Sequence, residues 1–417
     1  MLGFVGFVLV VVVGIHLYLW KRLVRDTLRP GPWRKAGGFV VLALALFVPA
    51  TLILVRGGYA EWLAWPGYLW IALMFYLLVI LVLLEIPRLL VRLIWRTSRR
   101  APEAEPAKQV AAARVDKGKR DGGAERPDGS DSAGGAPEQA GIDRRMLLAR
   151  GAAIFAGLTA AGITGYGVRT ALGGPRLDRV QIPLAKLPRA MDGTRLAVVS
   201  DIHLGPLTGP DHISRIVSMI NSTDADVVCI VGDLVDGTVE ELGAAAAGLR
   251  DIRARQGAYF VTGNHEYYSG FREWVDEVAR LDIRPLRNER LEIATGRGVF
   301  DLAGVNDPGG ADFGDAPDFA RALGDRDTAR PVVLMAHQPV VARDAARYGV
   351  DLQVSGHTHG GQMVPFNYLV GLQQPVVSGL GSVDGVPVYV TNGAGFWGPP
   401  VRVGAPPQVT LIELRAP

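Results

Sequence analysis

Cysteine is nearly absent from this 417-residue chain, and that absence restricts its chemistry. The single cysteine, Cys229, excludes an internal disulfide and makes a cysteine-ligated structural zinc site improbable. It stands inside the apolar run Val-Val-Cys-Ile-Val, so we expect a small buried side chain there. One cysteine leaves the redox compartment of the protein open.

An excess of one charge is also lacking. The 44 Lys and Arg residues nearly balance the 41 Asp and Glu residues, for a formal net charge of +3. Much of the arginine excess flanks long apolar runs, and the sequence has no basic patch interleaved with aromatic residues. We therefore expect no nucleic-acid partner.

Histidine is scarce but concentrated, since five of the seven histidines lie in short polar blocks. The blocks are Asp201-Ile202-His203, Gly232-Asp233, Gly263-Asn264-His265-Glu266, His337 and Gly356-His357-Thr358-His359. Most of them follow an apolar, β-branched run of the kind that forms buried strands. Ligand-type side chains at the ends of such strands would converge in one crevice.

The residue types in these blocks favour a metal centre. Asp-x-His and His-x-His place two side chains on the same face of an extended segment. Carboxylate, imidazole and amide oxygen suit divalent ions such as Mn, Fe or Zn. Taken singly, each block has an ordinary alternative, because Asn and Gly favour turns and a lone histidine is often a core residue. Together they offer seven candidate ligands, enough for two ions roughly 3.5–4 Å apart that share a carboxylate, as used for attack at phosphorus.

The order of these motifs resembles the calcineurin-like metallophosphoesterase superfamily, over about Arg195 to Leu414. The resemblance implies an α/β (α+β) fold, a β-sandwich flanked by helices. It implies two divalent metal ions (Mn, Fe or Zn) that share the bridging carboxylate of Asp233. The other implied ligands are Asp201, His203 and His359 for the first ion, and Asn264, His337 and His357 for the second. His265 would contact the phosphoryl oxygen or protonate the leaving oxygen, while Glu266 would orient His265 or cap a helix.

Two further stretches resemble the membrane-associated bacterial branch of that superfamily, which includes phosphodiesterases and relatives of lipid-linked pyrophosphate hydrolases. They are residues 356–362, Gly-His-Thr-His-Gly-Gly-Gln, and residues 392–398, Asn-Gly-Ala-Gly-Phe-Trp-Gly. Gln362, Asn392 and Trp397 are candidate substrate-binding residues near the expected crevice. Core packing is the alternative for the Phe396-Trp397 pair.

The first hundred residues contain long apolar stretches of a different kind. Residues 3–20, 37–55 and 62–84 each approach or exceed the roughly 20 residues that cross a bilayer. A signal peptide could explain the first stretch but not three in series. Buried core helices are the alternative. We expect a membrane domain of three transmembrane helices over residues 1–97.

Charge predicts how these spans are oriented. Six Lys and Arg residues lie between the first two stretches, and only Arg56 lies between the second and the third. More arginines follow the third stretch, between residues 88 and 100. The positive-inside rule then places the N-terminus outside and the segment after the third span in the cytoplasm.

Residues 98–143 are rich in Ala, Pro, Gly and charged residues, which predicts a disordered cytoplasmic linker. Residues 144–173 follow, where Arg144-Arg145 precedes the apolar run 152–168 and resembles a twin-arginine export signal. The alternative is a positive flank on a fourth transmembrane segment. Both interpretations deliver residues 176–417, the expected catalytic domain, to the extracytoplasmic face. If the run does not span, that domain stays cytoplasmic.

The catalytic domain should alternate strands and helices. Strands are expected at the runs that end near 200, 231, 262, 336 and 355, and over 299–305, 386–390 and 409–414. Helical spacing predicts helices over 210–221 and 238–250, with weaker patterns over 269–280, 316–323 and 339–346.

These features predict a membrane-anchored hydrolase with a binuclear metal centre. It would be a phosphodiesterase or pyrophosphatase that hydrolyses an extracytoplasmic phosphoester by attack of a metal-bridged hydroxide, and a lipid-linked ester is one candidate substrate. Its partners would be the lipid bilayer, the phosphoester and, if the arginine pair is a signal, the twin-arginine export machinery. The alternatives are a phosphomonoesterase with the same metal centre and a non-catalytic metal-binding membrane sensor.

Overall fold

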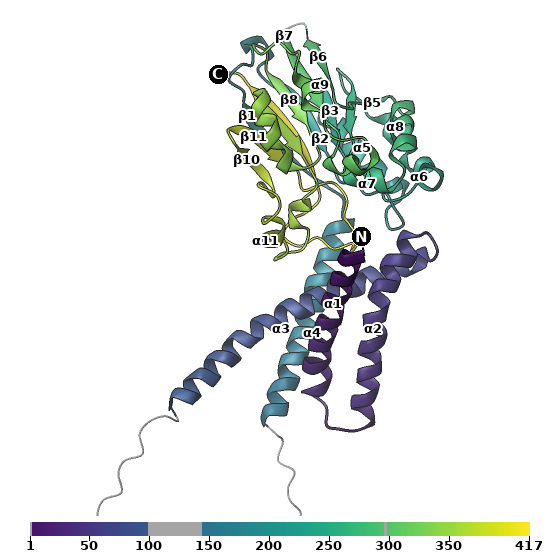
Figure 1. Cartoon of the computed structure of the whole chain (residues 1–417), viewed down its shortest axis with the longest axis vertical. Helices are drawn as coiled ribbons and strands as arrows, with labels where there is room; N and C mark the ends of the chain where they lie inside the picture. Colours follow the sequence, from purple (N-terminus) through teal and green to yellow (C-terminus); the bar gives the residue numbers. More distant parts are fainter. Residues whose placement is uncertain (1, 99–143, 296–297) are drawn as a thin grey trace, which may run out of the picture.

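The computed structural model describes residues 2–98, 144–295 and 298–417, which form a bundle of long helices below a helix-flanked pair of β-sheets (Figure 1). The helices of the bundle, with short π and 3₁₀ segments, are α1 (Leu2–Leu19), η1 (Trp20–Arg25), α2 (Pro32–Arg56), η2 (Glu61–Leu63), α3 (Ala64–Ser98) and α4 (Arg144–Leu172). The predicted linker lies, except for its first residue, outside the described residues.

Four stretches of the bundle are long and apolar enough to cross a membrane: Gly6–Arg25, Pro32–Arg56, Glu61–Leu90 and Arg145–Leu172. They contain the three predicted spans almost completely and the whole of the fourth apolar run. Large apolar side chains such as Phe39, Leu83 and Leu158 are exposed on these helices. Such surfaces suit lipid rather than water.

Small residues allow the helices of the bundle to approach closely. A Cβ atom on Gly67 of α3 would collide with the side chain of Thr51 on α2, so only glycine fits at this crossing. On α4, Ala156 and Ala160 are fully buried against the other helices. Close contact through small residues is the usual way in which helices associate in a bilayer. α3 crosses the other helices obliquely (Figure 1).

The strands form two six-stranded mixed sheets. The first sheet has the order β1-β12-β2-β3-β4-β5 and the second the order β10-β11-β9-β8-β7-β6. The strands are β1 (Arg176–Pro183), β2 (Thr194–Val199), β3 (Val227–Val231), β4 (Ala258–Val261), β5 (Ile283–Pro285), β6 (Glu289–Thr295), β7 (Gly298–Gly304), β8 (Val332–Met335), β9 (Leu352–Ser355), β10 (Gly379–Val383), β11 (Val386–Val390) and β12 (Gln408–Arg415).

The remaining helices flank the sheets. They are η3 (Arg189–Met191), α5 (Pro210–Asn221), α6 (Val239–Ala246), η4 (Ala247–Asp251), α7 (Asn264–Tyr268), α8 (Phe271–Arg280), η5 (Pro308–Phe313), α9 (Phe319–Leu323), η6 (Pro339–Val341), α10 (Ala342–Ala345), η7 (Ala346–Tyr348), η8 (His359–Gly361) and α11 (Asn367–Val370). One core lies between the two sheets, where Val198, Cys229 and Phe300 are fully buried. Two further cores lie under the helices on the outer faces, one around Trp274 and one around Ala342. The predicted sandwich with flanking helices is confirmed.

All eight predicted strands are present, and each occupies a central position in its sheet. The four that the sequence did not indicate, β1, β5, β6 and β10, are the edge strands. Edge strands are partly exposed, as the alternating burial of β1 illustrates, so they lack the continuous apolar runs that marked the central strands.

Candidate metal centre

The predicted ligands lie in loops at the carboxyl ends of neighbouring strands. β2, β3 and β4 run parallel in the first sheet, as do β7, β8, β9 and β11 in the second. Asp201, Asp233 and Asn264 follow strands of the first sheet, whereas His337, His357 and His359 follow strands of the second. The centre therefore forms where corresponding edges of the two sheets meet.

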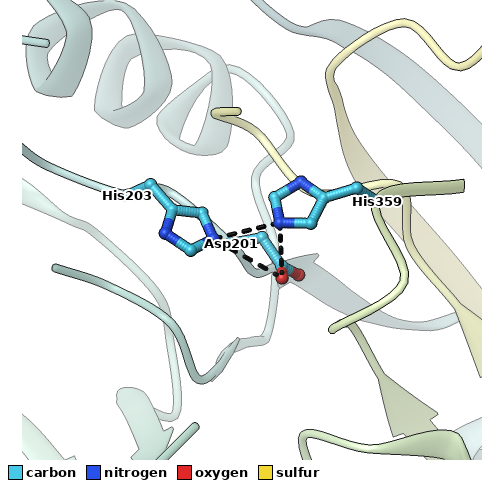
Figure 2. Close-up of side chains that lie close together, drawn as sticks. All are labelled: Asp201, His203 and His359. Atoms are coloured by element: carbon cyan, nitrogen blue, oxygen red, sulfur yellow. Dashed lines mark hydrogen bonds and ion pairs between the residues drawn. The ribbon is translucent and has the colours of Figure 1, made fainter. Parts of the chain in front are cut away.

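One group of side chains consists of Asp201, His203 and His359 (Figure 2). The Nε2 atoms of the two histidines are 3.0 Å apart, and Nε2 of His359 is 3.3 Å from Oδ1 of Asp201. All three residues are buried, and their ligand atoms point toward one another. This group could hold one divalent ion.

A second group consists of Asp233, His337 and His357. Oδ2 of Asp233 is 3.2 Å from Nε2 of His337 and 3.8 Å from Nε2 of His203. Nδ1 of His357 is 3.2 Å from Nε2 of His337. The Asp233 carboxylate thus lies between the two groups, where one of its oxygens can serve both.

Asn264 is a candidate ligand for the second group because its side-chain oxygen lacks a hydrogen-bond partner. Its Oδ1 atom is buried and has no hydrogen-bond partner among the described residues. An unpaired buried carbonyl oxygen is unfavourable unless a ligand completes it. An ion bound beside Asp233 would provide that partner, since amide oxygens are suitable ligands for hard divalent ions.

The backbone at these positions is strained. Asp201, His203, Asp233, His357 and His359 all have φ between 46° and 70°, in the left-handed region. Each such conformation costs of order 1–3 kcal/mol and persists only where the surrounding structure enforces it. Here the chain turns sharply at the strand ends, which aims the side chains toward one another.

Burial controls the protonation of the ligand histidines. Burial and the positive charge of His337 lower the pKa of His357 to about 3. Burial and Arg402 hold the pKa of His359 well below its ordinary value. Burial also disfavours a charged His337, but the carboxylates of Asp233, Asp201 and Asp307 together outweigh it and raise that pKa well above the ordinary value. A metal ion and a proton on His337 are thus alternative ways to balance the buried carboxylates.

His265 lies beside His203 of the first group, with ring centroids 4.6 Å apart, and next to a carboxylate that the sequence analysis did not single out. Its Nδ1 atom is 2.6 Å from Oδ1 of Asp236, which is also 2.9 Å from Nδ1 of His203. Burial opposes protonation of His265, but Asp233 and Asp236 outweigh it and raise its pKa to about 9. The imidazolium form therefore predominates near neutral pH, and the ring can donate a proton.

Glu266 supports Asp233 rather than reaching into the crevice. Its fully buried carboxylate accepts hydrogen bonds from the backbone N–H groups of Gly263, Asp233 and Leu234 at 2.6, 3.0 and 2.7 Å. The bond from Gly263 caps α7, which confirms the capping alternative. The same side chain fixes the loop that carries Asp233.

Arg402 connects the first group to the helical bundle. Its guanidinium is fully buried, donating to the carbonyl of His359 at 2.7 Å and lying 3.1 Å from Nδ1 of that ring. Its backbone N–H donates to the carbonyl of Gly167 on α4 at 3.0 Å. No sequence motif indicated this residue, because it lies outside the histidine-rich blocks.

Asp307 is a second carboxylate that the sequence analysis missed. It is fully buried after β7, accepts from Gln338 Nε2 at 3.1 Å, and has no partner for Oδ2 within the part of the chain that the structure describes. Burial raises its pKa to about 6 despite the opposing charge of His337. The sequence did contain a signal for Asp307, because this residue follows a predicted strand just as Asp201 and Asp233 do.

The three predicted substrate-binding residues have different surroundings. The amide of Gln362 donates to the carbonyls of Trp397 and Pro399 and accepts from the N–H of Trp397. Asn392 is buried and accepts from the hydroxyl of Ser378. Trp397 is 52% exposed, whereas Phe396 is buried, so core packing describes only one member of that pair.

The helical bundle approaches the centre from the side of His265. The guanidinium of Arg56, at the end of α2, lies 5.3 Å from the ring centroid of Tyr268, which lies 5.8 Å from the ring of His265. Tyr68 of α3 lies within electrostatic range of the Asp236 carboxylate. Leu207, four residues after His203, packs against Val55 and Leu63 of the bundle.

Comparison with known proteins agrees with this geometry. The family model of the calcineurin-like phosphoesterases matches residues 194–361. A zebrafish (Danio rerio) protein named transmembrane protein with metallophosphoesterase domain is 39% identical over 60% of this chain and 60% of its own length.

Bacterial relatives are similar over a comparable share of the chain. An uncharacterized metallophosphoesterase of Campylobacter jejuni is 36% identical over 60% of this chain and 65% of its own length. Another, from Aquifex aeolicus, is 32% identical over 58% of this chain and 92% of its own length. The chain thus spans about three fifths of the longer relatives and nearly all of the shorter one.

Replacement of Asp233 by Asn should reduce the metal content of the purified protein from about two ions per chain to one or fewer. The amide keeps the shape of the carboxylate but removes the charge that both groups share. Elemental analysis after loading with Mn measures the loss. Asp276→Asn, an exposed change on α8, is the control. Full metal content in Asp233→Asn would contradict the bridging role.

Proposed function

Because this chain belongs to the calcineurin-like metallophosphoesterase family, we propose that it is a membrane-anchored, metal-dependent phosphodiesterase or pyrophosphatase. The observation that carries this proposal is the position of Asp233, whose Oδ2 lies between the two ligand groups. A pair of sites that share a carboxylate is the arrangement used for in-line attack at phosphorus. A lipid-linked phosphoester of the kind hydrolysed in the membrane-associated branch is the proposed substrate.

The proposed ligands are those of the sequence analysis. Asp201, His203 and His359 would hold the first ion, and Asn264, His337 and His357 would hold the second. Asp233 would contribute to both. Mn, Fe or Zn would suit this mixed nitrogen and oxygen set. When bound, the two ions would supply Lewis-acid stabilisation of the phosphoryl group and a lowered pKa for the attacking water.

The protein contributes His265 as a proton donor and Asp236 as the carboxylate that favours its protonated form. His265 is protonated near neutral pH and only partly exposed, so it can stabilise charge on the departing oxygen or donate a proton to it. Asp236 orients its ring through Nδ1. The nearby Tyr268 and Arg56 border the same side of the crevice, and Trp397 offers an exposed aromatic surface for substrate.

We propose that this domain lies on the extracytoplasmic face. The helix end that carries Lys21, Arg22 and Arg25 lies at the far end of the bundle from the sheets (Figure 1). α4 begins at that same end with Arg144-Arg145 and ends beside the sheets. Positive charge favours the cytoplasmic side.

The proposed division is a membrane domain over 1–97, a cytoplasmic linker over 98–143, a fourth span over 144–173 with a twin-arginine-like start, and the catalytic domain over 176–417.

The hydrolytic activity is tested with the full-length protein in detergent, loaded with Mn. We expect cleavage of bis-p-nitrophenyl phosphate in preference to p-nitrophenyl phosphate, and a loss of about 10²–10⁴-fold in His265→Ala. Asp276→Asn is the surface control. Preference for the monoester would favour a phosphomonoesterase. Absence of turnover with both ions bound would contradict catalysis on such esters and favour a sensor.

The pH dependence should report the Asp236–His265 pair. Since Asp236 helps to raise the pKa of His265, Asp236→Asn should lower that pKa. The protonated donor is then lost at lower pH, so the alkaline limb of kcat/KM moves to lower pH. Activity should also fall about 10–100-fold, because Asp236 orients the His203 ring. Profiles from pH 6 to 11, with exposed Glu240→Gln as control, measure both effects; an unmoved limb would contradict the role of His265.

Single cysteines test the orientation against a low background, because Cys229 is fully buried. In intact cells a membrane-impermeant maleimide should label Asp325→Cys in the catalytic domain. It should label Arg29→Cys, between α1 and α2, only after permeabilisation. The opposite pattern would place the catalytic domain in the cytoplasm.

A further inference from the structure

A short apolar surface follows the last metal-ligand block. Residues 364–372, called here the 364–372 loop, include α11 and expose five large apolar side chains. The exposed fractions are 39% for Val364, 39% for Phe366, 74% for Tyr368, 58% for Leu369 and 84% for Leu372. An apolar cluster of this kind marks an interaction surface rather than ordinary water-exposed surface.

One side of the 364–372 loop rests on the membrane helices. The ring of Phe366 packs edge to face on Phe75 of α3, with centroids 6.4 Å apart at 81°. Met363, directly before the loop, packs in the same cluster as Val12 and Tyr76 of the bundle. Figure 1 shows α11 at the end of the sheets that faces the helices.

The contact with Phe75 indicates where the 364–372 loop lies along the candidate membrane span. Phe75 lies 14 residues after the start of the candidate span Glu61–Leu90, or about 20 Å along the helix axis. α3 is oblique to the other helices (Figure 1), so the depth of Phe75 in a bilayer would be smaller than this length. Phe366 therefore lies beside a residue of a candidate membrane span.

The other side of the loop is tied to the metal centre. Only two residues separate the ligand His359 from Gln362, which holds the backbone of Trp397. A Cβ on Gly361 would collide with Asn367 at the start of α11, so the ligand loop and the 364–372 loop pack directly on each other. A molecule held at the loop would thus be close to the proposed first ion.

We propose that the 364–372 loop, with Trp397, is a lipid-binding surface that inserts into the bilayer interface beside α3. Lipid is the occupant that fits, because the exposed side chains are apolar or, like Tyr368 and Trp397, amphipathic, and they continue the lipid-facing surface of the bundle. Resting on the proposed function, this surface specifies the substrate class as a phosphoester with a long apolar tail. The tail stays in the bilayer while the phosphoryl group reaches the metal centre.

Insertion is tested on the full-length protein in phosphatidylcholine–phosphatidylglycerol nanodiscs. An NBD fluorophore on Leu372→Cys should emit at shorter wavelength than one on Asp325→Cys, and doxyl-labelled phosphatidylcholine should quench only the former. Asp325 is 84% exposed by its side chain and follows α9. Equal emission at both positions would overturn the proposal. A blue shift without quenching by doxyl lipid would also overturn it, in favour of a protein partner or a second copy of the chain.

Substrate selection is tested with Leu369→Glu combined with Leu372→Glu. Hydrolysis of a dioleoyl phosphodiester in nanodiscs should fall at least about tenfold, because apolar contact with the bilayer is lost. Hydrolysis of bis-p-nitrophenyl phosphate should stay within about twofold, which also shows that the variant folds. Thr328→Glu with Ala329→Glu adds the same charge at exposed positions and should change neither rate.

The two measurements separate the possible failures. Equal losses on both substrates would overturn the role of the loop in selecting a lipid phosphoester. Absence of turnover in the parent protein, with insertion intact, would overturn the proposed function and leave the lipid-binding surface standing.

Discussion

The buried carboxylate of Asp233 is the constraint on which the centre depends. It lies between two groups of ligands, and a buried negative charge is tolerated only with compensating cations or hydrogen bonds. Glu266 fixes the Asp233 loop through backbone N–H groups, while His337 and His265 take up protons near it. The same negative charge makes the crevice a site for divalent ions, which can replace the proton on His337.

Direct contacts connect the membrane helices to the metal centre. Gly167 of α4 binds the backbone of Arg402, whose guanidinium holds His359. On another side, α2 and α3 bring Arg56 and Tyr68 to the surroundings of His265. The anchor therefore does more than keep the domain near a bilayer, because its side chains border the crevice and its helices fix the orientation of the catalytic face.

The sequence predicted the fold where burial is continuous. Apolar runs identified the eight central strands, and helical spacing identified α5 closely and α6, α8, α9 and α10 with shifted ends, but it missed the short helices α7 and α11. The edge strand β1, Arg-Leu-Asp-Arg-Val-Gln-Ile-Pro, has no such run, because only one of its neighbours is a strand. The pairing of β12 between β1 and β2 joins segments more than 200 residues apart, and no local pattern contains that information.

The sequence by itself determined which residue types stand at the strand ends, and hence a metal centre formed from Asp, His and Asn. Only the tertiary structure decided that Asp236 serves both His203 and His265, and that Arg402 supports His359. It alone brought the 364–372 loop against Phe75. The ligand blocks can be recognised in the sequence because their spacing matches the geometry of the strands that they follow. Supporting contacts depend on which distant segments the sheets and helices bring together, and that follows from packing of the whole chain.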